Sequence, residues 1–245
     1  MNCVTTMART IGKLEKKNYY NMGTLWTFGD SFTAGDGCVE NIPIRDGDFK
    51  YYNEYKQLDS DIWPNILGET IRYNVKNMGK SGASNDYILD SIIDNFNMIT
   101  LDDVVIIEKT FYQRFDVPKL NSDEFQTIYG EALYIMDTDL KKNKYNKDKL
   151  EIETILNYGV LFCQNSLFQE RQNKRFRFIE TLLKLNVKKI LIWDIDSDLR
   201  KSIETISRHT KGKIKDYHFS FNGHKEFSEL LYKKLYTKDI KLTLI

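Results

Sequence analysis

The segment Asp103–Ile107 most constrains the fold, because four consecutive apolar residues follow its aspartate. A strand with one face in water alternates apolar and polar side chains, whereas a continuous apolar run is typical of a strand buried on both faces. Strand-like segments at about 24–30, 74–78 and 189–194 alternate along the chain with helix-like segments. This order predicts an α/β fold in which a parallel sheet lies between two layers of helices.

The helix-like segments have recognisable starts. One helix is expected to begin near Trp63, which a proline follows, because proline suits the first turn of a helix. Ser84 or Asn85 is expected to cap a second helix. The segment 152–185 predicts one long or broken helix, and 223–236 predicts the last helix from its apolar residues at helical spacing.

Length and charge exclude several classes of protein. A chain of 245 residues is expected to form one main domain, and its net charge of +1 gives no reason to expect a nucleic-acid partner. No apolar run approaches the length of a membrane span. Residues 1–22 lack the apolar core of a secretory signal and are expected to form a disordered or loosely attached lead-in. The three cysteines form no CxxC pair, which favours free thiols and a cytoplasmic location.

The histidines and cysteines also bear on cofactors. There are three histidines, and neither they nor the cysteines show the spacing of a metal site. The chain has no glycine-rich phosphate-binding loop either. We therefore expect no metal and no cofactor.

Two segments far apart in the sequence hold the parts of a serine hydrolase. Gly29-Asp30-Ser31 follows the first strand, at the point where a strand turns into a helix and where free N–H groups surround the serine. Near the other end, Asp216 and His218 lie two residues apart, so that both side chains point to the same side of an extended segment. A histidine held by a carboxylate is the base that a serine nucleophile needs. The plainer alternative makes Ser31 a helix cap and His218 a surface residue.

These blocks resemble a known family. Gly-Asp-Ser near the N-terminus, the block Asn77–Asn85, a tryptophan-proline helix start and Asp-x-His ahead of Gly-His together resemble the SGNH (GDSL) hydrolases, in a phage or bacterial type of variant. The resemblance implies a three-layer α/β/α, flavodoxin-like fold with a central parallel sheet of about five strands. It also implies a single domain over 23–245, with an insertion at about 115–150.

The resemblance implies three oxyanion donors. Two are the backbone N–H groups of Ser31 and Gly79, and a glycine at 79 also lets the backbone approach a ligand closely, although a plain turn glycine is an alternative. The third donor in the family is an asparagine in a Gly-x-Asn block. Thr110 stands in its place here, and its hydroxyl could donate instead.

Two further side chains are candidates for substrate binding. Asn85 could take over the missing donor's role, although a capping or turn-stabilising role is the better interpretation. Arg114 could hold an anionic or polyhydroxyl group, or form a salt bridge with Asp116 or another neighbouring acid. His224 is expected to be structural, and Asp30 is expected to hold the turn rather than react.

The function implied by the resemblance is an ester hydrolase that works through an acyl-enzyme. Its partner is a small-molecule or glycan ester, and a carbohydrate O-acetyl esterase is favoured because no apolar lid is evident. Aromatic residues at 49–55 and Trp63 could stack on a sugar or serve as ordinary packing. A binding module without activity and an acyltransferase using the same serine are the alternatives. A virion-associated location also stays open, and the oligomeric state is not determined.

Overall fold

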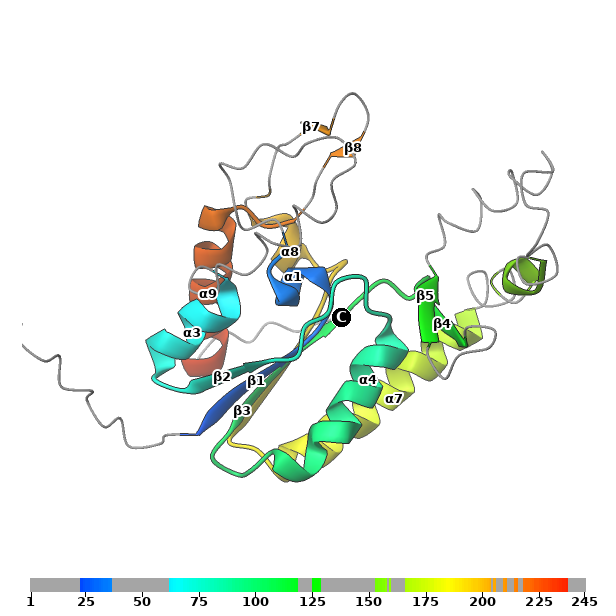
Figure 1. Cartoon of the computed structure of the whole chain (residues 1–245). Coiled ribbons are helices and arrows are strands. Elements are labelled where there is room, and N and C mark those ends of the chain that lie inside the picture. Colours follow the sequence, from blue (N-terminus) through cyan, green and yellow to red (C-terminus); the bar gives the residue numbers. More distant parts are fainter. Residues whose placement is uncertain are drawn as a thin grey trace, which may run out of the picture.

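The centre of the molecule is a four-stranded parallel sheet (Figure 1). The computed structural model describes residues 23–36, 62–118, 125–128, 153–157, 159, 166–203, 205, 209–210, 214–215 and 218–237. Across the sheet the strands follow the order β2 (Asn74–Asn77), β1 (Thr24–Phe28), β3 (Val104–Lys109) and β6 (Lys189–Asp194). Each neighbouring pair is parallel.

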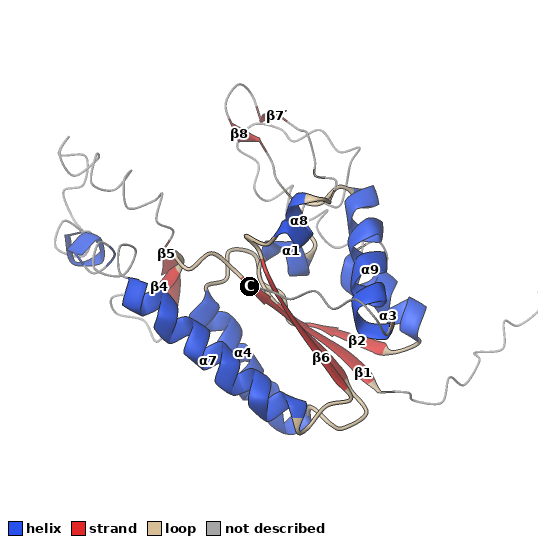
Figure 2. Ribbon diagram, turned by 180° about the vertical axis from the view of Figure 1, so that it is seen from behind, coloured by secondary structure: helices blue, strands red, loops and turns tan. Residues whose placement is uncertain are grey.

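Helices cover both faces of this sheet (Figures 1 and 2). α3 (Trp63–Ile71) and α9 (Phe221–Tyr236) pack on one face, and α4 (Asn85–Asn95) and α7 (Ser166–Lys184) pack on the other. Successive strand residues feed opposite cores, so that Leu25 packs with the α3–α9 layer and Trp26 with the α4–α7 layer. The predicted three-layer α/β/α architecture is therefore confirmed.

The sheet has four strands in the described part of the chain, where about five were expected. All four strands that the sequence located by residue are present. The fifth came only from the resemblance, without residues assigned to it. Past β6 the described strands are the two-residue pair β7 (His209–Thr210) and β8 (Ile214–Lys215), which is antiparallel and separate from the main sheet.

Smaller elements lie at the edges of the layers. They are α1 (Ser31–Ala34), the 3₁₀ turn η2 (Phe96–Met98), α8 (Asp198–Lys201) and the antiparallel pair β4 (Phe115–Pro118) and β5 (Phe125–Ile128). The β4–β5 pair occupies the start of the insertion expected at 115–150, whereas 129–150 lie outside the described residues. The lead-in 1–22 and the three cysteines also lie outside them. In the part of the chain that the structure describes, no helix is both long and apolar enough to cross a membrane.

The helix ends follow the chemistry of their caps. Ser84 caps α4, because its Oγ accepts the Tyr87 N–H at 3.0 Å. Ser220 does the same for α9 and accepts the Gly223 N–H at 3.0 Å, so α9 begins two residues before the expected start. Helical residues in 152–185 include 153–157 and α7 (Ser166–Lys184), and 158 and 160–165 lie outside the described residues, so the choice between one long and a broken helix stays a prediction.

The strand order also indicates at which edge of the sheet a ligand would bind. From β1 the chain crosses to β2 on one side and then returns to β3 on the other side. In open α/β sheets, ligands bind outside the carboxyl ends of the strands at such a reversal. Ser31 follows β1 and Thr110 follows β3, so both lie at this switch point.

Candidate active site

Ser31 is the first residue of the short helix α1. Asp30 caps this helix, and its Oδ1 accepts the Phe32 N–H at 3.0 Å. Ser31 is 6% exposed. Neither its hydroxyl nor its N–H donates a hydrogen bond to another described residue. The serine therefore stands at a helix start, where an N–H that no turn of the helix uses can serve an incoming oxygen.

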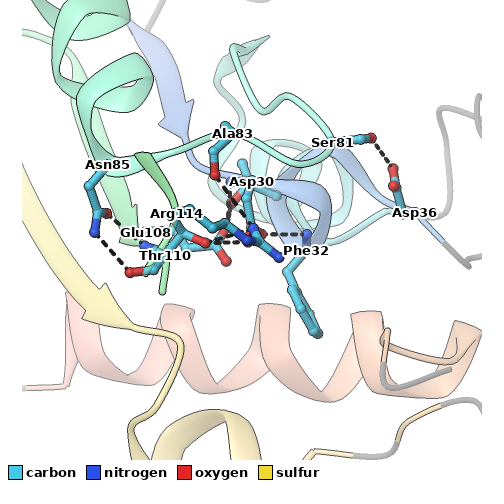
Figure 3. Close-up of polar contacts among 10 residues, drawn as sticks. Asp30, Phe32, Asp36, Ser81, Ala83, Asn85, Glu108, Thr110 and Arg114 are labelled. Atoms are coloured by element: carbon cyan, nitrogen blue, oxygen red, sulfur yellow. Dashed lines mark hydrogen bonds and ion pairs between the residues drawn. The ribbon is translucent and has the colours of Figure 1, made fainter. Parts of the chain in front are cut away.

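A buried ion pair fixes the turn ahead of Ser31 (Figure 3). Asp30 is fully buried, and its Oδ2 accepts the Thr110 hydroxyl at 2.6 Å and pairs with the Arg114 guanidinium. Arg114 also donates to Thr110 Oγ1 at 2.8 Å. Of the two alternatives for Arg114, the salt bridge is present, and its acid is Asp30 rather than Asp116. The expectation that Asp30 holds the turn is confirmed by its cap and these contacts.

Glu108 lies under the same turn and binds groups on both sides of Ser31. Its Oε2 accepts the Thr33 hydroxyl at 2.5 Å and the Asp30 N–H at 3.1 Å. Burial, the negative charge of Asp30 and a hydrogen bond with that side chain raise the pKa of Glu108 well above its ordinary value. Burial also acts to raise the pKa of Asp30, but the Glu108 side chain, Arg114 and Thr110 outweigh it, and the net pKa is lowered. The charge of the pair therefore sits on Asp30, and an uncharged Glu108 can donate to it.

Gly79 is required by the backbone of α1. A Cβ at this position would lie 2.5 Å from the Ala34 nitrogen and 2.7 Å from the Thr33 carbonyl carbon. The Gly79 N–H donates to Asn77 Oδ1 at 2.9 Å, and Asn77 Nδ2 donates to the Thr33 carbonyl at 2.8 Å. The close approach that we expected toward a ligand is thus made to the helix that carries Ser31. The predicted oxyanion donor already has an acceptor within the protein.

Thr110 and Asn85 form two hydrogen bonds with each other. The Thr110 N–H donates to Asn85 Oδ1 at 2.9 Å, and Asn85 Nδ2 donates to the Thr110 carbonyl at 2.9 Å. Because the Thr110 hydroxyl gives its one proton to Asp30, it has none left for an oxyanion in this arrangement. Asn85 is buried and works as a positioning group for the end of β3, close to the turn-stabilising role that we favoured over substrate contact.

His218 lies beside the residue that follows Ser31. The centroids of the His218 and Phe32 rings are 4.9 Å apart. Phe219 also packs against Phe32, with 5.1 Å between the ring centroids. The segments that carry Ser31 and His218 are more than 180 positions apart in the sequence and come into contact at the switch point. Asp216, the predicted partner of His218, lies outside the described residues.

His224 has a structural role, as expected. It is fully buried, and its Nδ1 accepts the Trp63 N–H at 3.2 Å, which satisfies a free donor at the start of α3. Burial, with a smaller contribution from the charge of His218, lowers the pKa of His224 to about 3. Trp63 is buried as well, and its Nε1 donates to the Phe32 carbonyl at 3.0 Å. Trp63 therefore serves as packing and is not exposed to stack on a sugar. The aromatic segment 49–55 lies outside the described residues.

Two residues of this site had no place in the predicted set. Arg200 of α8 lies over the Phe32 ring, with 4.8 Å between its guanidinium carbon and the ring centroid. Nothing in the sequence around Arg200 distinguishes it from a surface arginine. Glu108 did leave a signal, since a carboxylate that directly follows four apolar residues of a buried strand needs a partner in the interior.

No protein-family model and no curated protein sequence matches this chain. Among solved structures, it is similar to a carbohydrate esterase with divergent catalytic and non-catalytic binding functions at its active site. The identity is 13%, covering 89% of this chain and 69% of the other, with a TM-score of 0.43.

It is also similar to a member of the lipolytic G-D-S-L family from Veillonella parvula, at 12% identity over 86% of this chain and 96% of the other, with a TM-score of 0.36. The lipase Lip_vut3 from a goat rumen metagenome gives 15% identity over 86% and 96%, with a TM-score of 0.31.

Proposed function

We propose that this protein is a serine-dependent ester hydrolase of the SGNH type that works through an acyl-enzyme. Ser31 attacks the ester carbonyl, His218 takes its proton and passes it to the leaving alcohol, and Asp216 orients the imidazole ring. Water then releases the acyl group. The observation that carries the proposal is the packing of His218 against Phe32, the residue after Ser31, at the switch point of the sheet.

The favoured substrate is an O-acetylated carbohydrate. The preference rests on the sequence, in which no apolar lid is evident, because the polar groups of the Ser31 turn (Asp30, Arg114 and Thr110) are bound to one another. A short acyl group on a polar alcohol needs no such lid. The substrate is therefore a small-molecule or glycan ester.

The oxyanion donors need a new assignment under this proposal. The Ser31 N–H at the start of α1 is the donor that no described residue occupies. The Gly79 N–H is bound to Asn77, and the Thr110 hydroxyl is bound to Asp30. Loss of one oxyanion donor lowers turnover by a factor on the order of 10²–10³ in a well-studied hydrolase. We therefore expect a slow enzyme, unless substrate binding releases Gly79 from Asn77.

The same two hydrogen bonds favour a second candidate, a binding module that keeps the fold without turnover. A binding module needs no oxyanion donors, so that both groups can stay committed to internal partners. The two candidates differ in the reactivity of Ser31, because an activated serine hydroxyl reacts with an electrophilic phosphorus centre and an ordinary one does not.

Labelling with a fluorophosphonate probe, located by peptide mass spectrometry, tests the proposal. We expect stoichiometric labelling at Ser31 that is lost in Ser31→Ala and His218→Ala. Ser202→Ala removes an exposed serine and is expected to label like the wild type. If folded wild-type protein is not labelled at Ser31, the hydrolase proposal is wrong and the binding module is favoured.

A further inference from the structure

A polar cavity lies at the carboxyl ends of β3 and β6, next to Thr110. Its volume is about 300 Å³. Lys109 and Thr110 from the end of β3 line one side, and Asp194 from the end of β6 lines another. Gln172 and Asn173 of α7 complete much of the wall. Of the described residues that line the cavity, the predicted site included Thr110 and Asn85.

Gln172 lines this cavity and a second one beside α4 and β4, and its side chain has a hydrogen-bond donor that is not used. The residue is 3% exposed, and its Oε1 accepts from Asn85 Nδ2 at 3.2 Å. Its Nε2 is buried and has no hydrogen-bond partner among the described residues. An unsatisfied buried amide costs about 1–3 kcal/mol, so a ligand oxygen that accepts from it would recover that cost.

The charges around the cavity disfavour an anionic ligand. Lys109 Nζ is 3.0 Å from Asp194 Oδ2 and 3.4 Å from Asn173 Oδ1, so its charge already has partners. Asp196 adds a second carboxylate to the lining, which makes the net charge of these groups negative. A phosphate or a carboxylate would be repelled here. Because the remaining wall is largely amide and hydroxyl groups, a long acyl chain would find little apolar surface.

These features match a neutral ligand with several hydroxyl groups. Each hydroxyl can accept from an amide N–H and donate to a carboxylate, and the lining offers both kinds of partner. Tyr112 also lines the cavity and supplies an aromatic ring of the kind that packs on a sugar face. A volume near 300 Å³ is at the lower end of ligand pockets and fits a single small unit rather than a long chain.

The cavity is coupled to the turn that carries the nucleophile. Thr110 lines it, and the Thr110 hydroxyl donates to Asp30, the residue before Ser31 (Figure 3). Asn85 lines it too and binds both Thr110 and Gln172. A ligand in the cavity is therefore separated from the serine turn by one layer of hydrogen-bonded side chains.

We propose that this cavity is a sugar-binding subsite that holds a monosaccharide unit of the substrate through Gln172. Its role as part of a substrate site rests on the hydrolase function proposed above. Sugar binding itself needs no hydrolysis, and so the two proposals can fail separately.

The test measures sugar binding directly by saturation-transfer NMR on the full chain, with glucose and N-acetylglucosamine as probes and hexanoate and inorganic phosphate as comparison ligands. Gln172→Glu keeps the acceptor for Asn85 and replaces the unused donor with an oxygen. We expect it to weaken sugar binding roughly tenfold, the value of one hydrogen bond of about 1.4 kcal/mol. Asn186→Asp makes a matched amide-to-acid change at an exposed site in the turn after α7, and we expect wild-type binding.

A second variant protects the test against misfolding at the buried position. Tyr112→Ala removes the half-buried ring from the cavity wall and is expected to weaken sugar binding without lowering the midpoint of thermal unfolding. The inference is overturned if the wild type binds neither sugar, if it binds hexanoate or phosphate instead, or if both variants keep wild-type affinity. Sugar binding by Ser31→Ala protein, together with an unlabelled wild-type Ser31, would support the subsite and refute the hydrolase.

Discussion

The segments that carry Ser31 and His218 are held by different kinds of contact. The turn before Ser31 is fixed by buried charged groups, with Asp30 bound to Arg114 and Thr110. The segment around His218 packs through aromatic rings, and the Phe219 centroid lies 5.1 Å from that of Phe32 and 4.9 Å from that of Phe227. Directional bonds between charges fix the position of individual atoms, whereas ring packing fixes the approach of whole elements.

These different contacts predict how the turn before Ser31 and the segment around His218 respond to substitution. Groups in the Asp30 network depend on one another's charge, so the loss of one leaves another unpaired in the interior. The segment around His218 loses only contact area when an aromatic ring is replaced by a smaller side chain. It is followed by one buried base, His224. The turn before Ser31 and the segment around His218 should therefore differ in their sensitivity to substitution. The pH dependence of their contributions to stability should also differ in direction.

The largest expected effect comes from Arg114→Met, which leaves the buried Asp30 carboxylate without its cation. We expect a loss of about 3–5 kcal/mol in the free energy of unfolding, measured with urea. Arg175→Met is the matched control. Arg175 pairs with Asp86, but the two side chains are 41% and 27% exposed, so we expect a loss of about 1 kcal/mol or less. Equal losses in the two variants would contradict the view that the turn before Ser31 depends on a buried ion pair.

A smaller, pH-dependent effect is expected from His224. Its pKa in the folded protein is about 3, below the ordinary histidine value of about 6.5, so the unfolded state binds the proton first. The stability contributed by the neutral ring is present above pH 6.5 and falls by up to about 1.4 kcal/mol per pH unit as the pH drops toward 3.

In His224→Asn the amide oxygen can still accept the Trp63 N–H but cannot take up a proton. Urea unfolding at pH 6.5 and pH 5 should therefore show roughly 2 kcal/mol less acid destabilisation than in the wild type. The comparison uses the slope with pH, because the smaller side chain also changes stability at every pH. An unchanged slope would mean that His224 is not buried as a neutral ring.

The smallest effect at neutral pH is expected from Glu108→Gln. The pKa of Glu108 is raised, so its contribution to stability is present below the ordinary glutamate value and is lost as the pH rises through the folded value. Glutamine keeps an acceptor for the Thr33 hydroxyl and the Asp30 N–H but has no proton to lose. The midpoint of thermal unfolding should therefore fall less steeply between pH 7 and pH 10 in the variant than in the wild type. An equal fall in the two proteins would show that Glu108 is already charged in the folded protein at pH 7.

Much of the fold could be predicted from local patterns. The apolar run before Glu108 and the alternation of segments predicted the parallel sheet and its two helix layers, because burial on both faces leaves a direct mark on composition. The sequence left open whether 152–185 form one long or a broken helix, and it placed the start of α9 two residues too late. Their ends depend on single caps, such as Ser220, that compete with other polar residues nearby.

The site was predicted in part. The sequence placed Ser31 and Thr110 at strand ends, and the sheet order brings those ends together at the switch point. The sequence did not predict that Thr110 gives its proton to Asp30 or that the Gly79 N–H binds Asn77. Each of these residues has several possible hydrogen-bond partners, and spacing along the chain does not choose among them.

The sequence by itself determined the α/β class, the serine at the end of the first strand and the histidine ahead of the last helix, because periodicity and turn chemistry are local properties. Only the tertiary structure decided which polar groups pair in the interior: Arg114 with Asp30, Glu108 with Thr33, and Gln172 with Asn85. The physical reason is that a buried polar group binds the partner that the packing of the layers brings within reach, and that partner can lie 80 residues away in the chain.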